Sequence, residues 1–428
     1  MEQKYLSDEV YEQLKERCKR HGLCKECKQP NSGHHWCQSC SSKRFQKNFK
    51  NWTSGNPNVD KLIQESQFNA KNADEKIEWI EYDKFEKINY IMKGGFGTIY
   101  KAVWTEGSIV DWNYESNQWE RFHNRNVALK SLNDSKDITL EFLNEIKSNL
   151  KVNNSSQVTK ILGITKDPET CNFMMVMEFA ELGNLRRKIN IDFNSWDWFK
   201  KIDIISDIAH GLSDIHKEGL THQDFHSGNI LCNCNFEISD LGLCKPANEE
   251  SEKNNKNVYG VLPYVAPEVL RGKKYTQESD VYSFGIIIYE VCNGLPPYHD
   301  IAHDEFLAIK ICQGGLRPSF INKVPKLIED LVKQCVDADP SKRPTAEFLY
   351  RAFYQLYWDA FDSKNNKKDT EINKQIKEAD EFNKKQSSFT ISSDNAELTY
   401  TTHPQAIYTS RLLNFNNLPE QDNEYSGN

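Results

Sequence analysis

Hydrophobic and polar positions along this chain follow two periods, and the change between them predicts its main elements. Residues 88–104 and 126–132 are rich in β-branched and aromatic residues around a glycine-rich turn, which is typical of strands. Later stretches have apolar residues at helical spacing; they are 198–219, 279–294 and 324–338. Strands followed by helices predict one large α+β domain from residue 79 to about residue 358.

The segments on either side of this domain have different patterns. Residues 1–20 predict a short amphipathic helix within an N-terminal region of residues 1–50, and residues 51–78 form a turn-rich linker that contains another helix. Residues 359–428 are polar, which predicts a largely disordered tail. The one apolar patch of this tail, residues 403–413, docks either on the domain or on a partner, and its pattern does not decide between the two.

Composition limits the class of protein. The 428 residues carry a formal net charge of −8, which argues against a general nucleic-acid binder because phosphate affinity needs a basic surface. No apolar run approaches the roughly 20 residues of a membrane helix, and the N-terminal residues lack an apolar signal region. We therefore expect a soluble cytoplasmic protein with no membrane partner. Its twelve cysteines are then reduced thiols or metal ligands.

Four of these cysteines form two matched pairs. Cys24 and Cys27 are separated by two residues, as are Cys37 and Cys40, and nine residues lie between the pairs. Two such pairs can supply four thiolates to one tetrahedral Zn²⁺. A short N-terminal region has little core of its own, so metal binding would supply folding energy. The spacing predicts a structural zinc module, since a redox pair or unpaired surface thiols would not explain two matched pairs.

A basic and aromatic stretch follows the cysteines. It combines Lys43, Arg44, Lys47 and Lys50 with Phe45, Phe49 and Trp52. Nucleic-acid binding would place such residues on one face, and a helix that packs its aromatic side chains on the zinc module explains them equally. We favour a structural or protein-docking module, so nucleic acid is the less favoured partner.

A glycine-rich turn and a lysine point to phosphate. Residues 93–102 (KGGFGTIYKA) lie between strand-like runs, and glycine lets backbone N–H groups approach phosphate closely. Further along, strand alternation points Lys130 away from Val127 and Leu129. A lysine that projects into an interior needs an anion, and Glu145 is a candidate. Each signal alone is weak, because a plain hairpin turn and a solvated edge lysine explain them as well.

Two acidic loops follow. In THQDFHSGNIL (residues 221–231), Asp224 comes two positions after a histidine and five before Asn229. In residues 236–245, Asp240 ends a strand and precedes Leu-Gly, a turn that can aim a carboxylate at a metal.

The order of these motifs, closed by the Ala-Pro-Glu of residues 266–268, resembles the eukaryotic protein-kinase family from about residue 85 to residue 358. The resemblance implies a bilobal α+β fold. It gives an N-lobe of antiparallel sheet plus one helix over residues 79–180, and a mainly α-helical C-lobe over residues 181–358. The chain looks most similar to the tyrosine-kinase-like branch, which mostly phosphorylates Ser and Thr.

The resemblance also implies roles for individual residues. ATP and Mg²⁺ are the implied cofactors, with Asn229 and Asp240 as the Mg²⁺ ligands and Asp224 facing the substrate hydroxyl. Lys130 would hold the α- and β-phosphates and pair with Glu145. The other residues implied to line the nucleotide site are Gly94, Gly95, Phe96, Gly97, Met177, Glu178 and Ala180.

The same resemblance implies structural roles for three further residues. Glu268 would form an ion pair with Arg343, and Asp280 would brace the catalytic loop. The positions that depart from the family pattern are Met92, Asn149, Gln223, His226 and Val261. The absence of arginine at position 223 argues against switching by activation-segment phosphorylation. The changes at 226 and 261 leave the acceptor specificity open, and a polar residue at 149 needs a hydrogen-bond partner.

The sequence thus predicts a protein kinase that transfers the ATP γ-phosphate to a protein hydroxyl, with Ser or Thr favoured, in intracellular signalling. An alternative is an ATP-binding pseudokinase or scaffold that docks partners through the zinc module. A further alternative is a zinc-dependent adaptor for nucleic acid or protein. Protein substrates and a protein partner at the zinc module or tail are the expected partners.

Residues 104–130 predict an extended hairpin. This hairpin is either a surface excursion or a partner-binding element.

Overall fold

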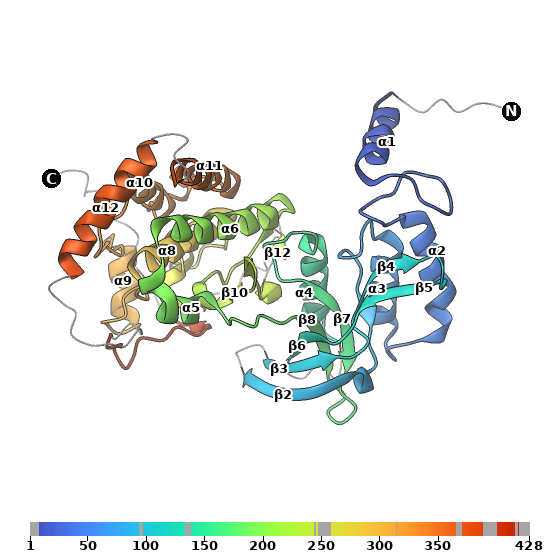
Figure 1. Ribbon diagram of the computed structural model, residues 1–428. Coiled ribbons are helices and arrows are strands. Elements are labelled where there is room, and N and C mark those ends of the chain that lie inside the picture. The colour runs from blue at the N-terminus through green and yellow to red at the C-terminus, as the bar shows by residue number, and fades with distance from the viewer. Residues whose placement is uncertain are drawn as a thin grey trace. The chain divides into compact units, whose positions relative to one another are not determined.

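A computed structural model gives the fold of this chain. It describes residues 8–93, 97–132, 138–243, 245–246, 258–313, 315–364, 370–387, 400–415 and 418. The chain divides into two compact units. The first comprises residues 1–154 and 159–179, and the second comprises residues 155–158 and 180–428. Figure 1 shows the elements of each unit.

The first unit is built on a six-stranded sheet in the order β1-β7-β8-β6-β3-β2 (Figure 1). Its strands are β1 (Glu78–Trp79), β2 (Phe85–Lys93), β3 (Gly97–Trp104), β6 (Arg125–Leu132), β7 (Ile161–Lys166) and β8 (Phe173–Glu178). The pairs from β7 to β2 are antiparallel, as the kinase resemblance implies, and the short edge strand β1 runs parallel to β7. Val127 and Leu129 of β6 are fully buried on one face of the sheet, and Ala128 packs on the other.

Two helices cover that other face. They are α3 (Pro57–Asn69) and α4 (Leu140–Val152). The α3 helix begins where Asn56 accepts hydrogen bonds from the next turn and Pro57 takes the first position. Val59 and Ile63 of α3 share a buried cluster with Phe142 of α4 and with residues of β7 and β8. The predicted linker helix is therefore part of the core of the first unit.

The N-terminal region of the first unit contains α1 (Asp8–His21), α2 (Gln38–Asn48) and a 3₁₀ turn, η1 (Phe49–Asn51). The predicted extended hairpin is present as β4 (Ser108–Asn113) and β5 (Gln118–Phe122). Ile109 of the hairpin is buried with Trp36, Phe45 and Ala70. The hairpin therefore packs on the cysteine-containing region, a contact that neither sequence interpretation anticipated.

The second unit is mainly helical. Its helices are α5 (Leu185–Asp192), α6 (Trp198–Lys217), α7 (Pro267–Leu270), α8 (Gln277–Asn293), α9 (Glu305–Cys312), α10 (Lys326–Cys335), α11 (Ala346–Lys364) and α12 (Glu371–Ser387). The apolar sides of α6 and α8 form much of its core, with Ile205, Ile208, Phe284 and Ile287 fully buried. A capping box at Thr276 starts α8, and Gly294 ends it with φ of +76°, a conformation that favours glycine.

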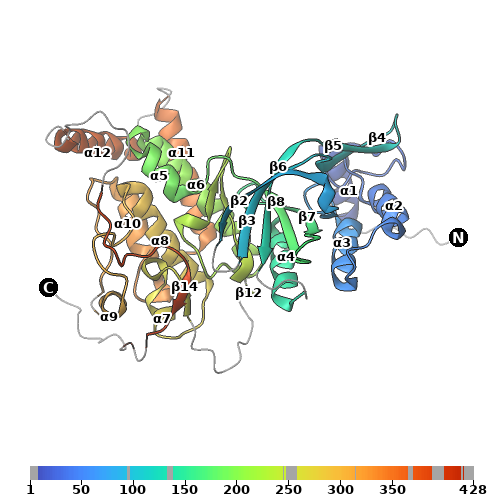
Figure 2. The ribbon, with the colours of Figure 1, turned by 90° about the horizontal axis from the view of Figure 1, so that it is seen from below.

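Three small two-stranded sheets complete the second unit. They are β10 (Ile230–Cys232) with β11 (Phe236–Ile238), β12 (Lys245–Pro246) with β9 (Leu220–Thr221), and β13 (Val258–Gly260) with β14 (Arg411–Leu413). The tail strand β14, coloured red-brown in Figure 2, belongs to the tail predicted to be largely disordered. That prediction is corrected for α12 and for residues 400–415, because both have buried apolar residues such as Ile372, Ala379 and Leu413.

Among the described residues, no helix combines the length and the apolar character that crossing a membrane requires.

Candidate active site

An ion pair lies at the centre of the first unit. Lys130 Nζ is 2.6 Å from Glu145 Oε1, and both residues are buried, at 7% and 4% exposure. Strand β6 supplies the lysine from the middle of the sheet, and helix α4, capped by Thr139, supplies the glutamate. The predicted pairing is confirmed. Separating a buried ion pair would leave one charge without compensation, which is costly. This cost keeps the Lys130 and Glu145 side chains together, so each holds the other in place.

The structure describes only some of the residues predicted to line the nucleotide site. Gly94, Gly95 and Phe96 lie outside the described residues, and Gly97 is the first residue of β3, opposite Leu132. Met92, at the position of a family glycine, is half-exposed on β2.

The end of β8 carries the other predicted nucleotide contacts. Met177 is buried there, and the Glu178 side chain forms an ion pair with Arg125. The backbone N–H of Glu178 donates to Lys160 O at 3.1 Å, so any adenine contact at Glu178 falls to its carbonyl oxygen. The Ala180 carbonyl accepts from Gly183 N at 3.2 Å.

In the second unit, the carboxylate of Asp280 holds the loop that contains Asp224. Its Oδ2 accepts from His222 N at 2.8 Å and its Oδ1 accepts from Gln223 N at 3.1 Å. The same Oδ2 faces His216 Nε2 at 3.0 Å, and Asp280 is 1% exposed. The predicted bracing role is therefore confirmed, and a buried carboxylate from α8 fixes the loop backbone.

His222 adds a second support beneath the loop. Its Nδ1 accepts from Asp224 N at 3.3 Å, and its Nε2 faces Ser239 O at 3.1 Å. Burial lowers the pKa of His222 against the opposing effect of Asp280 and Asp224. A neutral ring matches this pattern, because one nitrogen accepts and the other donates.

The Asp224 side chain is buried and charged. Asn229 Nδ2 lies 3.0 Å from Asp224 O and 3.4 Å from Asp224 Oδ2, while His226 Nε2 is 3.5 Å from Asp224 Oδ1. Burial raises the pKa of Asp224, but His226, Ser410 and His222 together outweigh burial and hold it below its usual range. Asp224 is therefore an ionised acceptor suited to taking a proton from a hydroxyl.

Asn229 and Asp240 come from neighbouring segments. Ser239, the residue before Asp240, donates to Asn229 O from its N at 2.8 Å and from its Oγ at 3.0 Å. Asp240 follows β11 with φ of +62°, an uncommon conformation for a residue other than glycine. The Asn229 amide nitrogen faces Asp224, which leaves the oxygen Oδ1 as its ligand atom. A carboxylate and an amide oxygen on linked segments fit the donor preference of Mg²⁺.

The departures from the family pattern have structural partners. Gln223, with φ of +69°, donates from Nε2 to Thr221 Oγ1 at 3.0 Å. Asn149 donates to Glu145 O at 2.8 Å, which supplies the partner that its burial requires. Val261 is fully buried. His226 Nδ1 accepts from Gly228 N at 3.0 Å, so its other nitrogen is directed at Asp224.

The predicted structural pair of the second unit is also confirmed. Arg343 donates to both carboxylate oxygens of Glu268 at 2.7 and 2.8 Å, and both residues are buried. This bidentate pair links Arg343, three residues before the start of α11, to helix α7.

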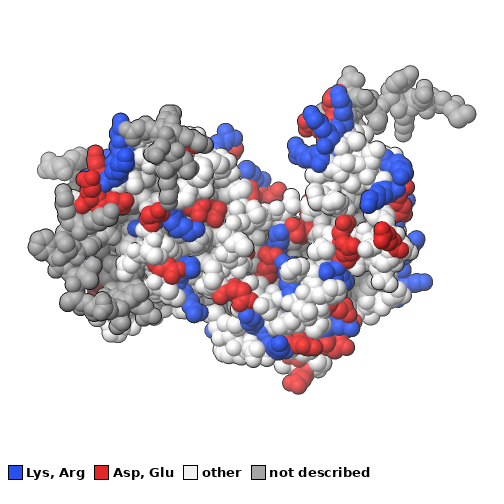
Figure 3. Space-filling view, viewed as in Figure 1, with Lys and Arg blue, Asp and Glu red and all other residues white. Residues whose placement is uncertain are grey.

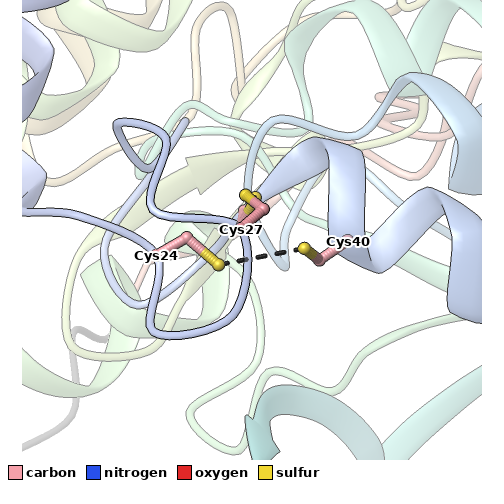
Figure 4. A group of neighbouring side chains, drawn as sticks. Cys24, Cys27 and Cys40 are labelled. Carbon is pink, nitrogen blue, oxygen red and sulfur yellow. Dashed lines mark hydrogen bonds between the residues drawn. The ribbon is translucent and has the colours of Figure 1, made fainter.

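The four paired cysteines converge. Their sulfur atoms lie within 4.8 Å of one another, with 3.8 Å between Cys24 and Cys40 and 3.5 Å between Cys27 and Cys37. Figure 4 shows Cys24 and Cys40 pointing toward each other from a loop and from α2. Four sulfurs at about 2.3 Å from Zn²⁺ would be separated by about 3.8 Å, so these thiols fit a tetrahedral zinc site.

The ionisation of the thiols differs within the cluster. Burial opposes ionisation of Cys24, but the backbones of Cys27 and Glu26 outweigh it and lower the pKa of Cys24 to about 6. Burial raises the pKa of Cys37 and of Cys40.

The hairpin closes over this cluster. The Trp119 ring stacks on Phe45 at 4.7 Å and on Trp36 at 5.6 Å, and the Arg44 guanidinium lies 4.1 Å from the Trp112 ring centre. The aromatic residue Phe45 of the basic stretch is thus used for internal packing. Figure 3 shows acidic side chains among the basic ones around α1 and α2 on the face in view. This packing supports the structural interpretation of Phe45.

One contact at Asp224 was missed by sequence reasoning. Ser410 Oγ lies 2.5 Å from Asp224 Oδ2 and 3.1 Å from His226 Nε2. The apolar patch at residues 403–413 indicated that this segment docks, but no spacing rule connects residue 410 with residue 224.

Comparison with known proteins agrees with this geometry. The family model for protein tyrosine and serine/threonine kinases matches residues 85–353. A putative serine/threonine-protein kinase/receptor of Acanthamoeba polyphaga mimivirus is 29% identical over 65% of this chain and 16% of its own length. MDIS1-interacting receptor like kinase 2 of Arabidopsis thaliana is 30% identical over 63% of this chain and 26% of its own length. A probable serine/threonine-protein kinase of Dictyostelium discoideum is 30% identical over 63% and 19%.

This chain therefore belongs to the protein kinase family. Its α+β class, with a mixed sheet in the first unit and a helical second unit, is that of the family, which implies ATP and Mg²⁺ as its ligands. The chain spans about a sixth to a quarter of the length of these curated relatives.

Proposed function

We propose that this protein transfers the γ-phosphoryl group of ATP to a Ser or Thr hydroxyl of a protein, as a kinase of the tyrosine-kinase-like branch in intracellular signalling. The observation that carries the proposal is the ionised, buried Asp224 with a hydroxyl already 2.5 Å from its Oδ2. Family membership and the serine/threonine-kinase names of the relatives support the reaction and the acceptor type.

The residues divide the chemistry between them. Lys130, oriented by Glu145, would bind the α- and β-phosphates of ATP, and Asp224 would accept the proton of the attacking hydroxyl. Asn229 and Asp240 would hold Mg²⁺, which neutralises charge on the phosphates when bound. The reaction requires these residues to act on the same nucleotide.

Phosphate transfer from radiolabelled ATP to a generic protein substrate tests this proposal. The protein should incorporate label into Ser or Thr, as phosphoamino-acid analysis would show, and Asp240→Asn should reduce incorporation to background. Glu347→Gln is the matched control, because it also removes one carboxylate, from an exposed pair with Arg351 on α11. Equal background incorporation by the wild type and Asp240→Asn would refute the kinase proposal and leave the pseudokinase alternative.

We also propose that the cysteine cluster binds one structural Zn²⁺ and forms a module for docking a protein partner in the cytoplasm. A cluster of free thiols is suited to a reducing compartment. Elemental analysis of the purified full chain should find one zinc per protein, lost in Cys24→Ser and retained in Cys18→Ser. Cys18 is the matched control, since it is a free cysteine of α1 outside the cluster. A wild type without zinc would contradict this proposal.

A further inference from the structure

The apolar patch of the tail is bound along the second unit. We name residues 400–413 the tail segment. His403 N donates to His299 O at 2.8 Å, and Tyr408 Oη donates to Pro297 O at 2.8 Å. Both acceptors lie in the loop between α8 and α9. The tail segment is therefore anchored before it reaches the catalytic loop.

Contacts of two arginines hold the tail segment in place on either side of residues 409 and 410. Arg186 of α5 donates to Tyr408 O at 2.9 Å, and its guanidinium lies 4.6 Å from the centre of the Tyr408 ring. Arg411 of the tail segment donates to His303 O at 2.7 Å. The two contacts bracket residues 409 and 410 between fixed points on both sides.

The tail segment then adds a strand to the catalytic unit. In the antiparallel pair of β14 with β13, Gly260 is opposite Arg411 and Val258 is opposite Leu413. Leu413 is buried at 3% exposure, whereas its neighbour Leu412 is 46% exposed. Strand addition is a common mode of peptide recognition, in which main-chain hydrogen bonds give affinity and pockets for alternate side chains give specificity.

This pairing sets the position of Ser410. His226 Nδ1 accepts from Gly228 N at 3.0 Å, and His226 Nε2 faces Ser410 Oγ at 3.1 Å. Ser410 in turn donates its proton to Asp224 Oδ2 at 2.5 Å. The hydroxyl thus has a proton acceptor within the distance required of a general base. Thr409, the preceding residue, is exposed.

We propose that the tail segment occupies the protein-substrate groove of its own catalytic unit and that Ser410 is an autophosphorylation site modified in cis. The proposal rests on the kinase function proposed above. It deepens that function by naming one acceptor, and it states how a peptide acceptor binds: as a strand added to β13, with the hydroxyl residue just before the strand.

The chemical step balances within this site. Ser410 Oγ attacks the γ-phosphorus of ATP, and an Oγ–P bond forms. The bond between the γ-phosphorus and the oxygen that bridges to the β-phosphate breaks, and its electron pair leaves with ADP. The proton of Ser410 passes to Asp224 Oδ2.

The product should bind less well than the unmodified tail segment. Phosphoserine carries about −1.5 to −2 charges at neutral pH, and the Asp224 carboxyl group lies 2.5 Å from the hydroxyl that would carry the phosphate. Repulsion between them favours release of the tail segment, so phosphorylation of Ser410 would open the groove to other substrates. The unmodified tail segment would compete with them.

Mass spectrometry of the full chain after incubation with Mg·ATP tests the acceptor. We expect phosphate on Ser410 with a rate per molecule that does not change on dilution, which is the signature of a reaction in cis. Ser410→Ala should abolish the modified peptide, and Thr409→Ala, the matched control, should leave Ser410 phosphorylation unchanged. A generic substrate in the same tube separates the two proposals.

Each outcome then has a defined meaning. Phosphate in the generic substrate with none on Ser410 overturns the present proposal and leaves the kinase function standing. Phosphate in neither overturns both. A rate on Ser410 that rises with protein concentration overturns modification in cis.

A pair of leucine variants tests whether the tail segment occupies the groove. Both are made in the Ser410→Ala protein, because the wild-type tail segment would be phosphorylated and released during an assay with ATP. In that background, Leu413→Asp places a charge at a buried position and should weaken docking, which lowers KM for a peptide substrate about tenfold, given the burial energy of a leucine. Leu412→Asp adds the same charge on the exposed side of the same strand and should leave KM unchanged. Equal KM values for Ser410→Ala with and without Leu413→Asp would overturn the occupied groove.

Discussion

Different interactions hold the catalytic loop around Asp224 and the N-terminal module that contains the cysteine cluster in place. The loop around Asp224 is fixed by a buried carboxylate, Asp280, which belongs to the long helix α8. The module is fixed by a sulfur cluster and by aromatic packing of Trp36, Phe45 and Trp119.

This difference determines what each segment depends on. The anchor of the catalytic loop is part of a helix whose fifteen residues from Ser279 to Asn293 are all buried, so the loop is anchored to the core of the second unit. The module has only a small apolar cluster, and it shares that cluster with the hairpin and Ala70. Small domains with little core rely on added links such as metals. Removing a link should therefore unfold the module while the catalytic loop stays folded.

The largest expected effect is that of Cys24→Ser. Loss of one thiolate should release the zinc, whose apparent binding free energy in small modules is on the order of 10 kcal/mol. Hydrogen exchange of the full chain should show lost protection in residues 24–48 and retained protection in residues 220–232. Cys18→Ser should keep protection in both regions. Intact protection in the module of Cys24→Ser would show that the aromatic packing suffices without metal.

A smaller effect, confined to chemistry, is expected for Asp224→Asn. The amide cannot accept the substrate proton, so kcat should fall about a thousandfold. The protein should stay folded, because Asp280 and not Asp224 holds the loop. Steady-state transfer to a generic substrate and circular dichroism measure the two effects, with Glu347→Gln as the control. A variant that keeps most of its activity would remove Asp224 from the reaction.

The anchor itself should give the next largest change. Asp280→Ala leaves two backbone N–H groups of the loop without their acceptor and should lower the free energy of unfolding by about 3 kcal/mol. Glu278→Ala, in the same helical turn but exposed, should cost only about 0.5 kcal/mol. Urea denaturation of both variants measures this. Similar values for the two would mean that the loop has another anchor.

The sequence predicted best what depends on near neighbours along the chain. The strand alternation at Lys130 and the convergence of the cysteines follow from short spacings, and the structure has both. The pairing of Lys130 with Glu145 was implied by the family resemblance, and the structure has it too. The hairpin was predicted as an element but not its contact with Phe45. Packing between segments far apart in the chain depends on side-chain shape in three dimensions, which periodicity does not encode.

The tail is a second case in which contacts between segments far apart in the chain were not predicted. Its polar composition predicted a largely disordered segment, and composition does describe how little apolar surface such a segment can bury. Residues 400–413 are nevertheless ordered, because their hydrogen bonds go to the second unit, as at His299 and Pro297. The acceptors are backbone carbonyl groups of the loop between α8 and α9, and no pattern in the sequence identifies them.

The smallest expected effect concerns the charge on Asp224, which His226 influences from 3.5 Å. The pKa of Asp224 is held below its ordinary value of 3.8, so the carboxylate should stay ionised, and kcat/KM should not lose this base, until the pH falls below that value. Any stability that the ionised form contributes is likewise present above the ordinary value and lost as the pH falls through the lowered pKa.

The variant His226→Gln tests this influence. It removes the main group that opposes the effect of burial on Asp224, so the pKa of Asp224 should rise and the acid limb of the kcat/KM profile should move to higher pH. His210→Gln, on α6, should leave the limb in place. An acid limb that is unchanged in His226→Gln would show that Ser410 and His222 keep Asp224 ionised without it.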